Sequence, residues 1–291
     1  MLSDHQGAHL MRVLVTGATS MIGDFLLPRL CQAGHEVIAT SRKEHPPQQG
    51  IQWLRLDLSQ PGALAKMGQV DVWINLTSLS LLRPAAAHMA ESMGISRLIA
   101  FSSTSKFTKA DARSSMDRRF ARELKKSEDW LEAFCAEHGI HVNILRPTMI
   151  YCRGRDKNVT TILRFIERFG FFPLVGGGKG LRQPVHAEDL AMACMQILEH
   201  NQLPSRGYNL SGGEILSYRE MVERLFAVLN RPVRIVPVPL FAFRWAIALA
   251  RLLPGYRFLT PDMACRIMKD MVFSHQAASR DFGYKPRPFQ P

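Results

Sequence analysis

The sequence predicts an α/β protein with a parallel, doubly wound sheet, helices on both faces, and a smaller C-terminal part. The stretch at 13–23, VLVTGATSMIG, reads as a buried strand that turns through glycine into an amphipathic helix. Further short apolar runs recur along the first half of the chain. A length of 291 residues with 46% hydrophobic content suits one large domain, or a main domain with a small second one.

The first predicted strand, 13–15, ends at Thr16 and Gly17, and the helix after it covers 23–33 and stops at Gly34. The first-turn amides of a helix have no intrahelical partner, and the helix dipole favours negative charge there. Gly17 lets the backbone approach a phosphate closely, and Gly23 lets the helix pack tightly on the strand. The stretch therefore predicts an anion-binding site, and its alternative is an ordinary strand-to-helix turn.

The same stretch resembles the TGxxGxxG fingerprint of the extended short-chain dehydrogenase/reductase superfamily, which includes nucleotide-sugar epimerases and dehydratases. Ser20 replaces the middle glycine, and a serine can still turn the loop and offer its hydroxyl to a phosphate. The resemblance covers nearly the whole chain after residue 11. It implies a Rossmann-type sheet that binds NAD(P). It assigns cofactor contacts to Gly17, Thr19, Ser20, Met21, Ile22 and Gly23.

The second predicted strand, 35–39, is followed by Thr40-Ser41-Arg42-Lys43. Members of the superfamily that prefer NAD usually carry an acidic residue here, which binds the ribose hydroxyls. This chain has Ser41 at that place and two cations after it. Arginine suits a 2′-phosphate because it has several donors and a permanent charge. The resemblance implies NADP(H) in preference to NAD(H), with Ser41, Arg42 and Lys43 as contacts; the alternative is a solvated basic turn.

The third and fourth predicted strands, 51–56 and 70–76, end in residues that the resemblance places beside the cofactor. Asp57 matches an aspartate near the adenine amino group, and Leu58 follows it. Asp57 also suits the cap of a following helix, and both roles can hold. Leu76 and Thr77 match the segment behind the cofactor. A short helix is expected at 84–93.

The triplet Ser102-Ser103-Thr104 closes the fifth predicted strand, 95–101. The catalytic serine or threonine of the superfamily lies at the end of this strand, and Thr104 matches it by position. Its usual task is to hydrogen-bond the reacting hydroxyl or carbonyl. The resemblance therefore implies Thr104 as a catalytic residue and Ser103 as a substrate contact. Taken alone, the triplet would read as a polar strand end.

The catalytic Tyr-x-x-x-Lys pair expected on the next helix is missing. Counting back from the sixth strand places the pair on Phe120 and Leu124, and residues 52–149 contain no tyrosine. Lys125 and Lys126 follow the expected lysine position, but one step along a helix rotates a side chain by ~100°. A phenylalanine cannot donate a proton. The sequence therefore predicts that the usual proton relay is absent.

The sixth predicted strand, 141–145, leads into a stretch at 146–152 that resembles the superfamily's RPxxIYG, with Cys152 in place of glycine. The backbone after Pro147 commonly faces the nicotinamide amide, so the resemblance implies Pro147 as a cofactor contact. Residues 154–158 begin a segment on the substrate side. Asn158 is assigned to the substrate there.

The stretch at 181–190, LRQPVHAEDL, resembles the epimerase segment R-x-x-V-H-x-x-D-L, whose arginine holds a nucleotide-sugar diphosphate. The resemblance implies that Arg182 binds the substrate. Asp189 is expected to begin the following helix, and His186 is expected to pack rather than react. A returning strand and loop are expected at 208–212, helices at 217–230 and 243–253, and an irregular tail at 282–289.

The chain is thus expected to have a floppy tail at 1–10, an NAD(P)-binding domain at 11–150 and a mainly substrate-binding part at 151–291, with some segments returning to the sheet. The net charge of +12 suits an anionic ligand, a membrane surface or nucleic acid. Only the anionic ligand has a supporting motif. Without zinc-finger spacing or an RNA-binding signature, nucleic acid is not expected as a partner.

Other features bear on location and partners. Five cysteines, far apart and without a CxxC pair, indicate reduced thiols in a cytoplasmic protein. No cysteine-rich spacing accompanies the histidines, and no metal site is expected. No apolar run reaches the ~20 residues of a spanning helix. The aromatic stretch at 238–253 leaves open a weak membrane-surface contact, with a packed helix as its alternative. A homodimer is also left open.

Two functional hypotheses follow. In the first, the protein is an NAD(P)-dependent oxidoreductase of the epimerase/dehydratase type, acting on a nucleotide-sugar or a related phosphorylated substrate. The Arg182 segment favours this hypothesis. In the second, the protein is a non-catalytic NADP(H)-binding sensor or structural subunit. The missing Tyr-Lys pair favours that alternative.

Overall fold

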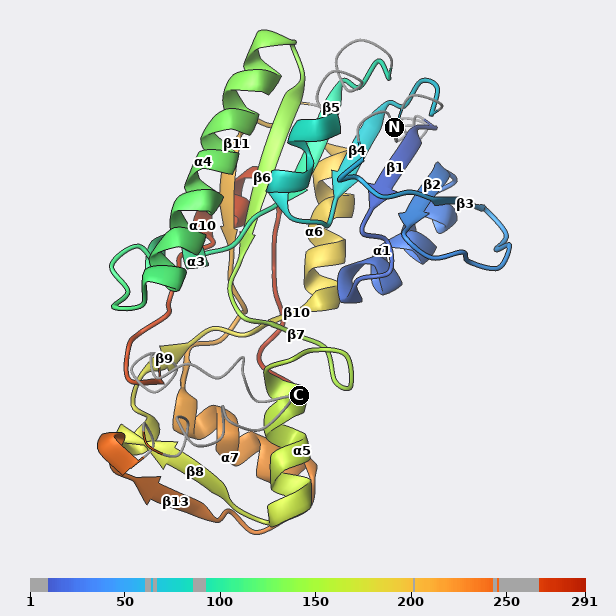
Figure 1. The fold of residues 1–291 in the computed structure, drawn as a ribbon. Coiled ribbons are helices and arrows are strands. Elements are labelled where there is room, and N and C mark those ends of the chain that lie inside the picture. Colours follow the sequence, from blue (N-terminus) through green and yellow to red (C-terminus); the bar gives the residue numbers. More distant parts are fainter. Residues whose placement is uncertain are drawn as a thin grey trace, which may run out of the picture.

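A parallel sheet forms the centre of the protein (Figure 1). The computed structural model describes residues 10–60, 64, 67–85, 93–200, 202–242, 245 and 267–291. In this part of the chain, a seven-stranded sheet has the order β11-β6-β5-β4-β1-β2-β3, and every neighbouring pair is parallel. The predicted fold class is therefore confirmed. The strands are β1 (Arg12–Thr16), β2 (Glu36–Ser41), β3 (Ile51–Arg55), β4 (Val72–Asn75), β5 (Arg97–Phe101), β6 (His141–Pro147) and β11 (Arg206–Leu210).

The strand order reverses between β1 and β4. From β1 the chain winds through β2 to β3 on one side, and from β4 it winds through β5 and β6 to β11 on the other. In open α/β sheets, ligands bind outside the carboxyl ends of the strands at such a reversal. The loop after β1 lies at this place.

Helices cover both faces of the sheet, because alternate strand residues point to opposite sides. On one face, Val13 and Val15 belong to a core shared with α1 (Met21–Gln32), α6 (Ala187–Glu199) and α10 (Gln276–Phe282). On the other face, Leu14 and Trp73 belong to a core shared with α4 (Ser115–Glu137) and the 3-10 turn η1 (Leu79–Leu81). The valine-rich and isoleucine-rich strands are thus buried on both sides, as parallel strands usually are.

A smaller part lies beyond the carboxyl ends of the strands (Figure 1). Its core contains Val159, Ile166, Leu225 and Phe226. The elements of this part and its junction are β7 (Ile150–Tyr151) with β10 (Val185–His186), α5 (Val159–Phe169), β8 (Phe172–Val175) with β13 (Ile235–Val238), η3 (Gly176–Gly178), β9 (Leu181–Arg182) with β12 (Leu216–Ser217), and α7 (Tyr218–Val228). The short elements η2 (Arg83–Ala85) and α3 (Ser105–Thr108) belong to the loops after β4 and β5.

Several predicted boundaries shift in the structure. The second strand continues to Ser41, because β2 pairs with β3 as far as Ser41 and Arg55. The irregular tail expected at 282–289 begins after α10, and it is anchored by the buried rings of Tyr284 and Phe289. The tail at 1–10 and the helices expected at 84–93 and 243–253 fall largely on residues outside the described ranges. Among the helices that are described, none is long and apolar enough to cross a membrane.

Candidate functional site

The loop after β1 follows a path that depends on its glycines. Gly17 has a φ of +72°, and a Cβ at that position would lie 2.9 Å from Thr77 Cγ2. Glycine alone accepts this backbone conformation at little cost while letting the loop pass so close to the end of β4. A Cβ on Gly23 would lie 1.9 Å from the carbonyl oxygen of Ala18. Both glycines are therefore required by the backbone path.

Ser20 caps the helix that follows this loop. Its Oγ accepts a hydrogen bond from the Gly23 amide at 3.2 Å, and α1 begins at Met21, earlier than predicted. A hydroxyl has one proton to donate besides its acceptor lone pairs, so Ser20 can cap α1 and still donate to a phosphate. The amides of Met21 and Ile22 head the helix, where its dipole is positive. The geometry suits a bound anion.

A buried polar chain supports the loop from below. Trp73 Nε1 donates to Thr16 Oγ1 at 2.9 Å, and Thr16 Oγ1 donates to Asn75 Oδ1 at 2.8 Å. Thr77 Oγ1 donates to the same Asn75 oxygen at 2.6 Å. The Leu76 amide donates to the Thr16 carbonyl at 2.9 Å. These bonds hold Leu76 and Thr77 beside the loop. Sequence reasoning missed Trp73, which an apolar run does not distinguish from its neighbours.

The end of β2 carries the cations assigned to a 2′-phosphate. Arg42 and Lys43 are exposed, and the Lys43 amide donates to Ser41 Oγ at 3.1 Å. Asp57 Oδ1 accepts hydrogen bonds from the Ser59 amide and hydroxyl at 3.0 and 2.7 Å. These bonds, with the nearby charge of Arg42, hold the pKa of Asp57 below its ordinary value.

Thr104 and Pro147 are held together at the ends of β5 and β6. Thr104 Oγ1 donates to the Pro147 carbonyl at 3.0 Å, and the Thr104 amide donates to the same oxygen at 3.1 Å. The Thr104 hydroxyl is buried and its proton is committed to a carbonyl. The Thr104 hydroxyl can therefore accept a hydrogen bond from a ligand. The Pro147 carbonyl, to which it donates, cannot act as a base that takes its proton. The neighbouring Ser103 Oγ accepts from the Ser105 amide at 3.1 Å.

The positions counted for the Tyr-Lys pair lie on α4. Phe120 is 46% exposed, and Lys109 Nζ lies 4.7 Å from the centre of its ring. Leu124 is half-buried one turn further along the helix. Neither side chain can donate or accept a proton. General acid–base chemistry from these two positions is therefore absent.

One further turn along the same helix face brings a buried carboxylate, Glu128. It accepts hydrogen bonds from Ser102 Oγ at 2.5 Å, Lys106 Nζ at 2.5 Å and Arg146 Nη2 at 2.6 Å. Burial raises the pKa of Glu128, but the bonds from Arg146, Lys106 and Ser102 outweigh it, and the net pKa lies below the ordinary value. Sequence reasoning missed this cluster. The spacing of four residues from Leu124 was the available signal, because such residues share a helix face.

The segment assigned to the substrate begins with a capping aspartate. Asp156 is buried and accepts from the Asn158 amide at 2.7 Å and from Thr160 Oγ1 at 2.7 Å. Asn158 itself precedes α5 and makes no side-chain cap bond. The main role visible at this turn therefore belongs to Asp156. The role of Asn158 toward a substrate stays a prediction.

Arg182 is buried within the smaller part. Its Nη1 donates to the carbonyls of Leu181 and Lys269, each at 2.7 Å. Its guanidinium lies 5.3 Å from the centre of the Tyr218 ring. These contacts fix the position of the guanidinium in advance. Its binding to a diphosphate stays a prediction.

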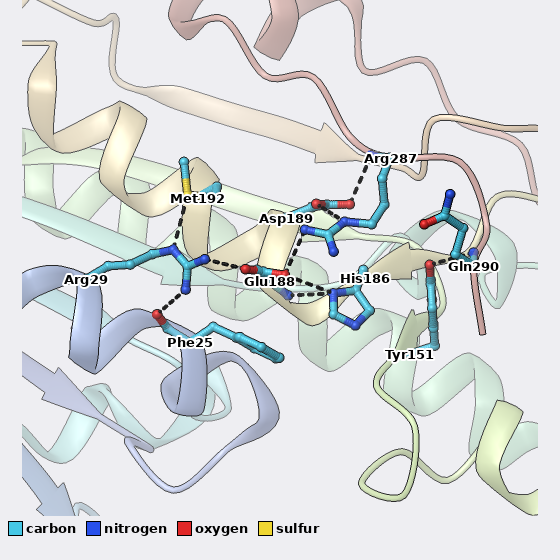
Figure 2. A network of polar contacts seen from close by, with 9 residues as sticks. All are labelled: Phe25, Arg29, Tyr151, His186, Glu188, Asp189, Met192, Arg287 and Gln290. Carbon is cyan, nitrogen blue, oxygen red and sulfur yellow. Dashed lines mark hydrogen bonds and ion pairs between the residues drawn. The ribbon is translucent and has the colours of Figure 1, made fainter.

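A polar network joins α1, α6 and the C-terminal stretch (Figure 2). Arg29 of α1 pairs with Glu188 of α6. Arg287 pairs with Glu188 at 2.9 Å and with Asp189 at 2.7 Å. Two acidic side chains in the first turn of α6 are thus compensated from two distant segments, in addition to the favourable helix dipole.

His186 caps α6. Its Nδ1 accepts from the Glu188 amide at 3.2 Å, so the helix begins at Ala187, and the prediction that Asp189 begins it was wrong. The cap residue is a histidine, which is not among the usual capping residues. The sequence therefore favoured Asp189, a usual capping residue, as the start of the helix. The His186 ring packs against two aromatic rings: its centre lies 5.5 Å from the centre of the Phe25 ring and 5.0 Å from that of the Tyr151 ring (Figure 2). Burial lowers the pKa of His186, which favours the neutral, packed form.

The described ranges contain no cluster of side chains that could bind a metal ion and no disulfide bond. No group of histidine, cysteine, aspartate and glutamate among those residues is arranged to hold a metal ion. The described cysteines, Cys31, Cys135, Cys152 and Cys194, are free thiols, and Cys265 lies outside the described residues. Burial raises the pKa of Cys135 to about 12, which makes that thiol inert at neutral pH.

The assigned cofactor residues fall into three groups by position. The loop after β1, the first turn of α1 and the adjoining end of β4 carry Gly17, Thr19, Ser20, Met21, Ile22, Gly23, Leu76 and Thr77; the ends of β2 and β3 carry Ser41, Arg42, Lys43, Asp57 and Leu58; the end of β6 carries Pro147. All of them lie at or beyond the carboxyl ends of parallel strands. A ligand laid across that edge would meet the groups in turn.

The chain is similar in sequence to several known proteins. A model of the NAD dependent epimerase/dehydratase family matches residues 13–211. A 2-alkyl-3-oxoalkanoate reductase from Stenotrophomonas maltophilia (strain K279a) is 27% identical over 320 residues, which cover 95% of this chain and 95% of the reductase. The mitochondrial NADH dehydrogenase (ubiquinone) 1 alpha subcomplex subunit 9 of Arabidopsis thaliana is 27% identical over 252 residues, which cover 77% of this chain and 60% of that subunit.

A solved structure extends the likeness to the fold. The UDP-glucuronic acid 4-epimerase from Bacillus cereus, in complex with UDP-glucuronic acid and NAD, superposes with a TM-score of 0.72 at 14% sequence identity. The superposition covers 96% of this chain and 95% of the epimerase. The two proteins therefore share the fold of both the sheet and the smaller part.

Proposed function

We propose a function for this chain, which belongs to the NAD-dependent epimerase/dehydratase family. It binds NADP(H) at the loop after β1 and acts as an oxidoreductase on a nucleotide-sugar or a related phosphorylated substrate. The observation that carries the proposal is the glycine loop. It combines Gly17, the α1 amides and the strand-order reversal at one place. When bound, a nicotinamide cofactor would supply or accept the hydride. The residues of this chain would bind it and orient it.

The preference for NADP(H) rests on the end of β2. Arg42 and Lys43 are exposed there, and Ser41 occupies the position at which an acidic residue would repel a 2′-phosphate. Losing one charge-assisted phosphate contact costs roughly 1.5–3 kcal/mol, or about ten- to a hundredfold in affinity. Calorimetry with NADPH and NADH tests the preference. We expect Arg42→Ala to remove it.

The control for that experiment is Arg219→Ala, which removes another exposed arginine, on α7. It should leave both affinities unchanged. Equal affinities of the wild-type protein for NADPH and NADH would contradict the preference. An Arg42→Ala variant that still prefers NADPH would contradict the assigned residue.

The substrate side of the proposal concerns mainly residues 151–291, with Arg182 as the diphosphate contact and Asn158 as a further contact. Ser103, which follows β5, is a third contact. The Stenotrophomonas relative is named as a reductase, and the Bacillus structure contains UDP-glucuronic acid and NAD; both support a nicotinamide-dependent reaction. Nucleoside diphosphates and nucleotide-sugars should raise the melting temperature by mass action. The Arg182→Lys variant should lose that increase and keep its response to NADPH. No nucleotide effect would count against this substrate class.

A second candidate function is a non-catalytic NADP(H)-binding subunit or sensor. The specific observation in its favour is that Phe120 and Leu124 stand where a proton donor and a lysine are expected. The Arabidopsis relative is named as a subunit of NADH dehydrogenase, which also supports a structural role. Measured turnover distinguishes the two candidates. The free thiols support a cytoplasmic location under either proposal.

A further inference from the structure

The loop after β1 carries no cation of its own. In residues 17–24 the single charged side chain is Asp24, a carboxylate in the first turn of α1. A diphosphate at the start of α1 would be attracted by the helix dipole and repelled by this carboxylate. A positive charge from another segment would offset the repulsion by Asp24 and strengthen the attraction of a doubly charged ligand.

Arg155 brings that charge from the loop after β7. Its Nη1 lies 2.7 Å from Asp24 Oδ2, and its Nη2 donates to the Thr19 carbonyl at 3.1 Å. The Arg155 side chain is 49% exposed, so the guanidinium lies at the glycine loop and also faces solvent. The contact joins a segment of the later chain to the predicted phosphate site. In Figure 1 the loop after β7 lies below α1.

The loop that presents Arg155 is held by many internal bonds. The amides of Arg155 and Asp156 both donate to the Cys152 carbonyl, at 2.9 and 3.1 Å. Gly154 has a φ of +82°, which the tight turn requires. The buried Asp156 carboxylate accepts from the Thr160 amide and hydroxyl. Because the backbone is already fixed, a ligand that binds Arg155 loses little binding energy to ordering the loop.

We propose that Arg155 is the cation that binds the diphosphate of the cofactor. This inference rests on the proposed function, because it concerns the same glycine loop. The guanidinium exchanges the Asp24 carboxylate for a phosphate oxygen when the cofactor binds. An arginine presents five N–H donors in a planar fork, so it can keep the Thr19 carbonyl and hold a phosphate as well. The role differs from that of Arg42, since NADH and NADPH share the diphosphate and only NADPH has the 2′-phosphate.

Calorimetry with NADH and with NADPH tests the role of Arg155. The Arg155→Ala variant should bind both cofactors about ten- to a hundredfold more weakly, as expected for a lost charge-assisted bond. The ratio of the two affinities should stay as in the wild type. The matched control is Arg153→Ala, which removes an exposed arginine from the same loop. It should bind both cofactors within about twofold of the wild type.

A second substitution separates direct contact from simple neutralisation of Asp24. Asp24→Asn should tighten cofactor binding severalfold, because it removes the repelling carboxylate. In that background, Arg155→Ala should still weaken binding about tenfold. If Arg155 only neutralised Asp24, its removal would cost nothing there, and the proposal would be overturned. Thermal melts should show that each variant is folded.

The outcomes separate this inference from the function on which it rests. A wild-type protein that binds neither cofactor overturns both. A wild-type protein that binds NADPH, together with an Arg155→Ala variant that binds it equally well, overturns the role of Arg155 and leaves the cofactor site standing. A loss confined to NADPH would show that Arg155 contacts the 2′-phosphate, and this too overturns the diphosphate assignment.

Discussion

Arg146 at the end of β6 binds both carboxylate oxygens of Glu128 on α4. Its Nη2 lies 2.6 Å from Oε2, and its Nε lies 3.2 and 3.0 Å from Oε1 and Oε2. The Glu128 side chain is fully buried and that of Arg146 is 14% exposed. Lys106 adds a second cation at 2.5 Å. The cluster thus ties α4 to the ends of β5 and β6, beside Thr104 and Pro147.

Replacing this buried carboxylate should destabilise the protein strongly. Glu128→Gln keeps the shape of the side chain but leaves the mostly buried Lys106 without this counter-charge, and leaves Arg146 with only Glu132, whose Oε1 lies 4.0 Å from Arg146 Nη2. Breaking a buried ion pair on one side typically costs about 3–5 kcal/mol. Urea denaturation should show that loss in the free energy of unfolding. The adjacent Asp129→Asn, which breaks only an exposed pair with Lys125, should change it by less than about 0.5 kcal/mol. Similar losses in both variants would contradict the role of burial.

Acid should act through the same carboxylate. The pKa of Glu128 in the folded protein lies below its ordinary value of 4.5. Its contribution to stability is therefore complete at pH values above that ordinary value, and is lost as the pH falls through the lower folded-state pKa. The free energy of unfolding of the wild type should fall more steeply over that acidic window than that of Glu128→Gln. Parallel curves between neutral pH and pH 3 would contradict the prediction.

Turnover should be slow or absent in the wild type. General acid–base catalysis is typically worth 10²–10⁴-fold, and neither Phe120 nor Leu124 can supply it. The double variant Phe120→Tyr with Leu124→Lys should raise NADPH oxidation measured against a panel of nucleotide-sugars. Thr104→Ala should lower whatever activity is present. Fast wild-type turnover that survives Thr104→Ala would show that other residues do the chemistry. An inert wild type with tight NADPH binding would favour the structural subunit.

The C-terminal stretch should contribute to stability like an ordinary core segment. Phe289 is 2% exposed, and its ring lies 4.9 Å from that of Tyr151. Truncating a buried phenylalanine to alanine typically costs about 3–5 kcal/mol. Phe289→Ala should therefore lower the urea midpoint markedly. The exposed Lys285→Ala, in the same stretch, should barely change it. A negligible effect of Phe289→Ala would mean that this stretch is not docked in solution.

A glycine with no room for a Cβ should respond differently to an added methyl group from a glycine that faces open space. Gly23→Ala would place a Cβ 1.9 Å from the Ala18 carbonyl oxygen, so the loop after β1 must move. We expect it to lose cofactor binding as well as stability. Gly139→Ala meets nothing within 4 Å and carries only the strain of a φ of +67°, about 1 kcal/mol. Calorimetry and thermal melts on both variants check this. Intact NADPH binding in Gly23→Ala would contradict the loop's assigned role.

The fold could be predicted because its signals are local. The strand at 13–15, the glycine turn and the helix after it are contiguous in the sequence, and each apolar run reports its own burial. The contacts at the ends of the strands were harder to predict. Glu128 reads as one more polar residue on an amphipathic helix, and Arg155 as one more surface arginine. Their partners are Arg146 in one case and Asp24 in the other, on different elements, and only the folded chain shows which charges meet.

The position of β11 at the edge of the sheet has a consequence for the order of events during synthesis. Residues 11–150 emerge from the ribosome first, but β6 gains its outer neighbour only when 206–210 have been made. The face covered by α6 and α10 stays open until residue 282 has emerged. An uncovered apolar face beside an unpaired strand is prone to aggregation. The half of the chain that carries the glycine loop is therefore made early and completed late, and a slow or crowded translation system should cause more aggregation of this chain than of one whose sheet is completed in sequence order.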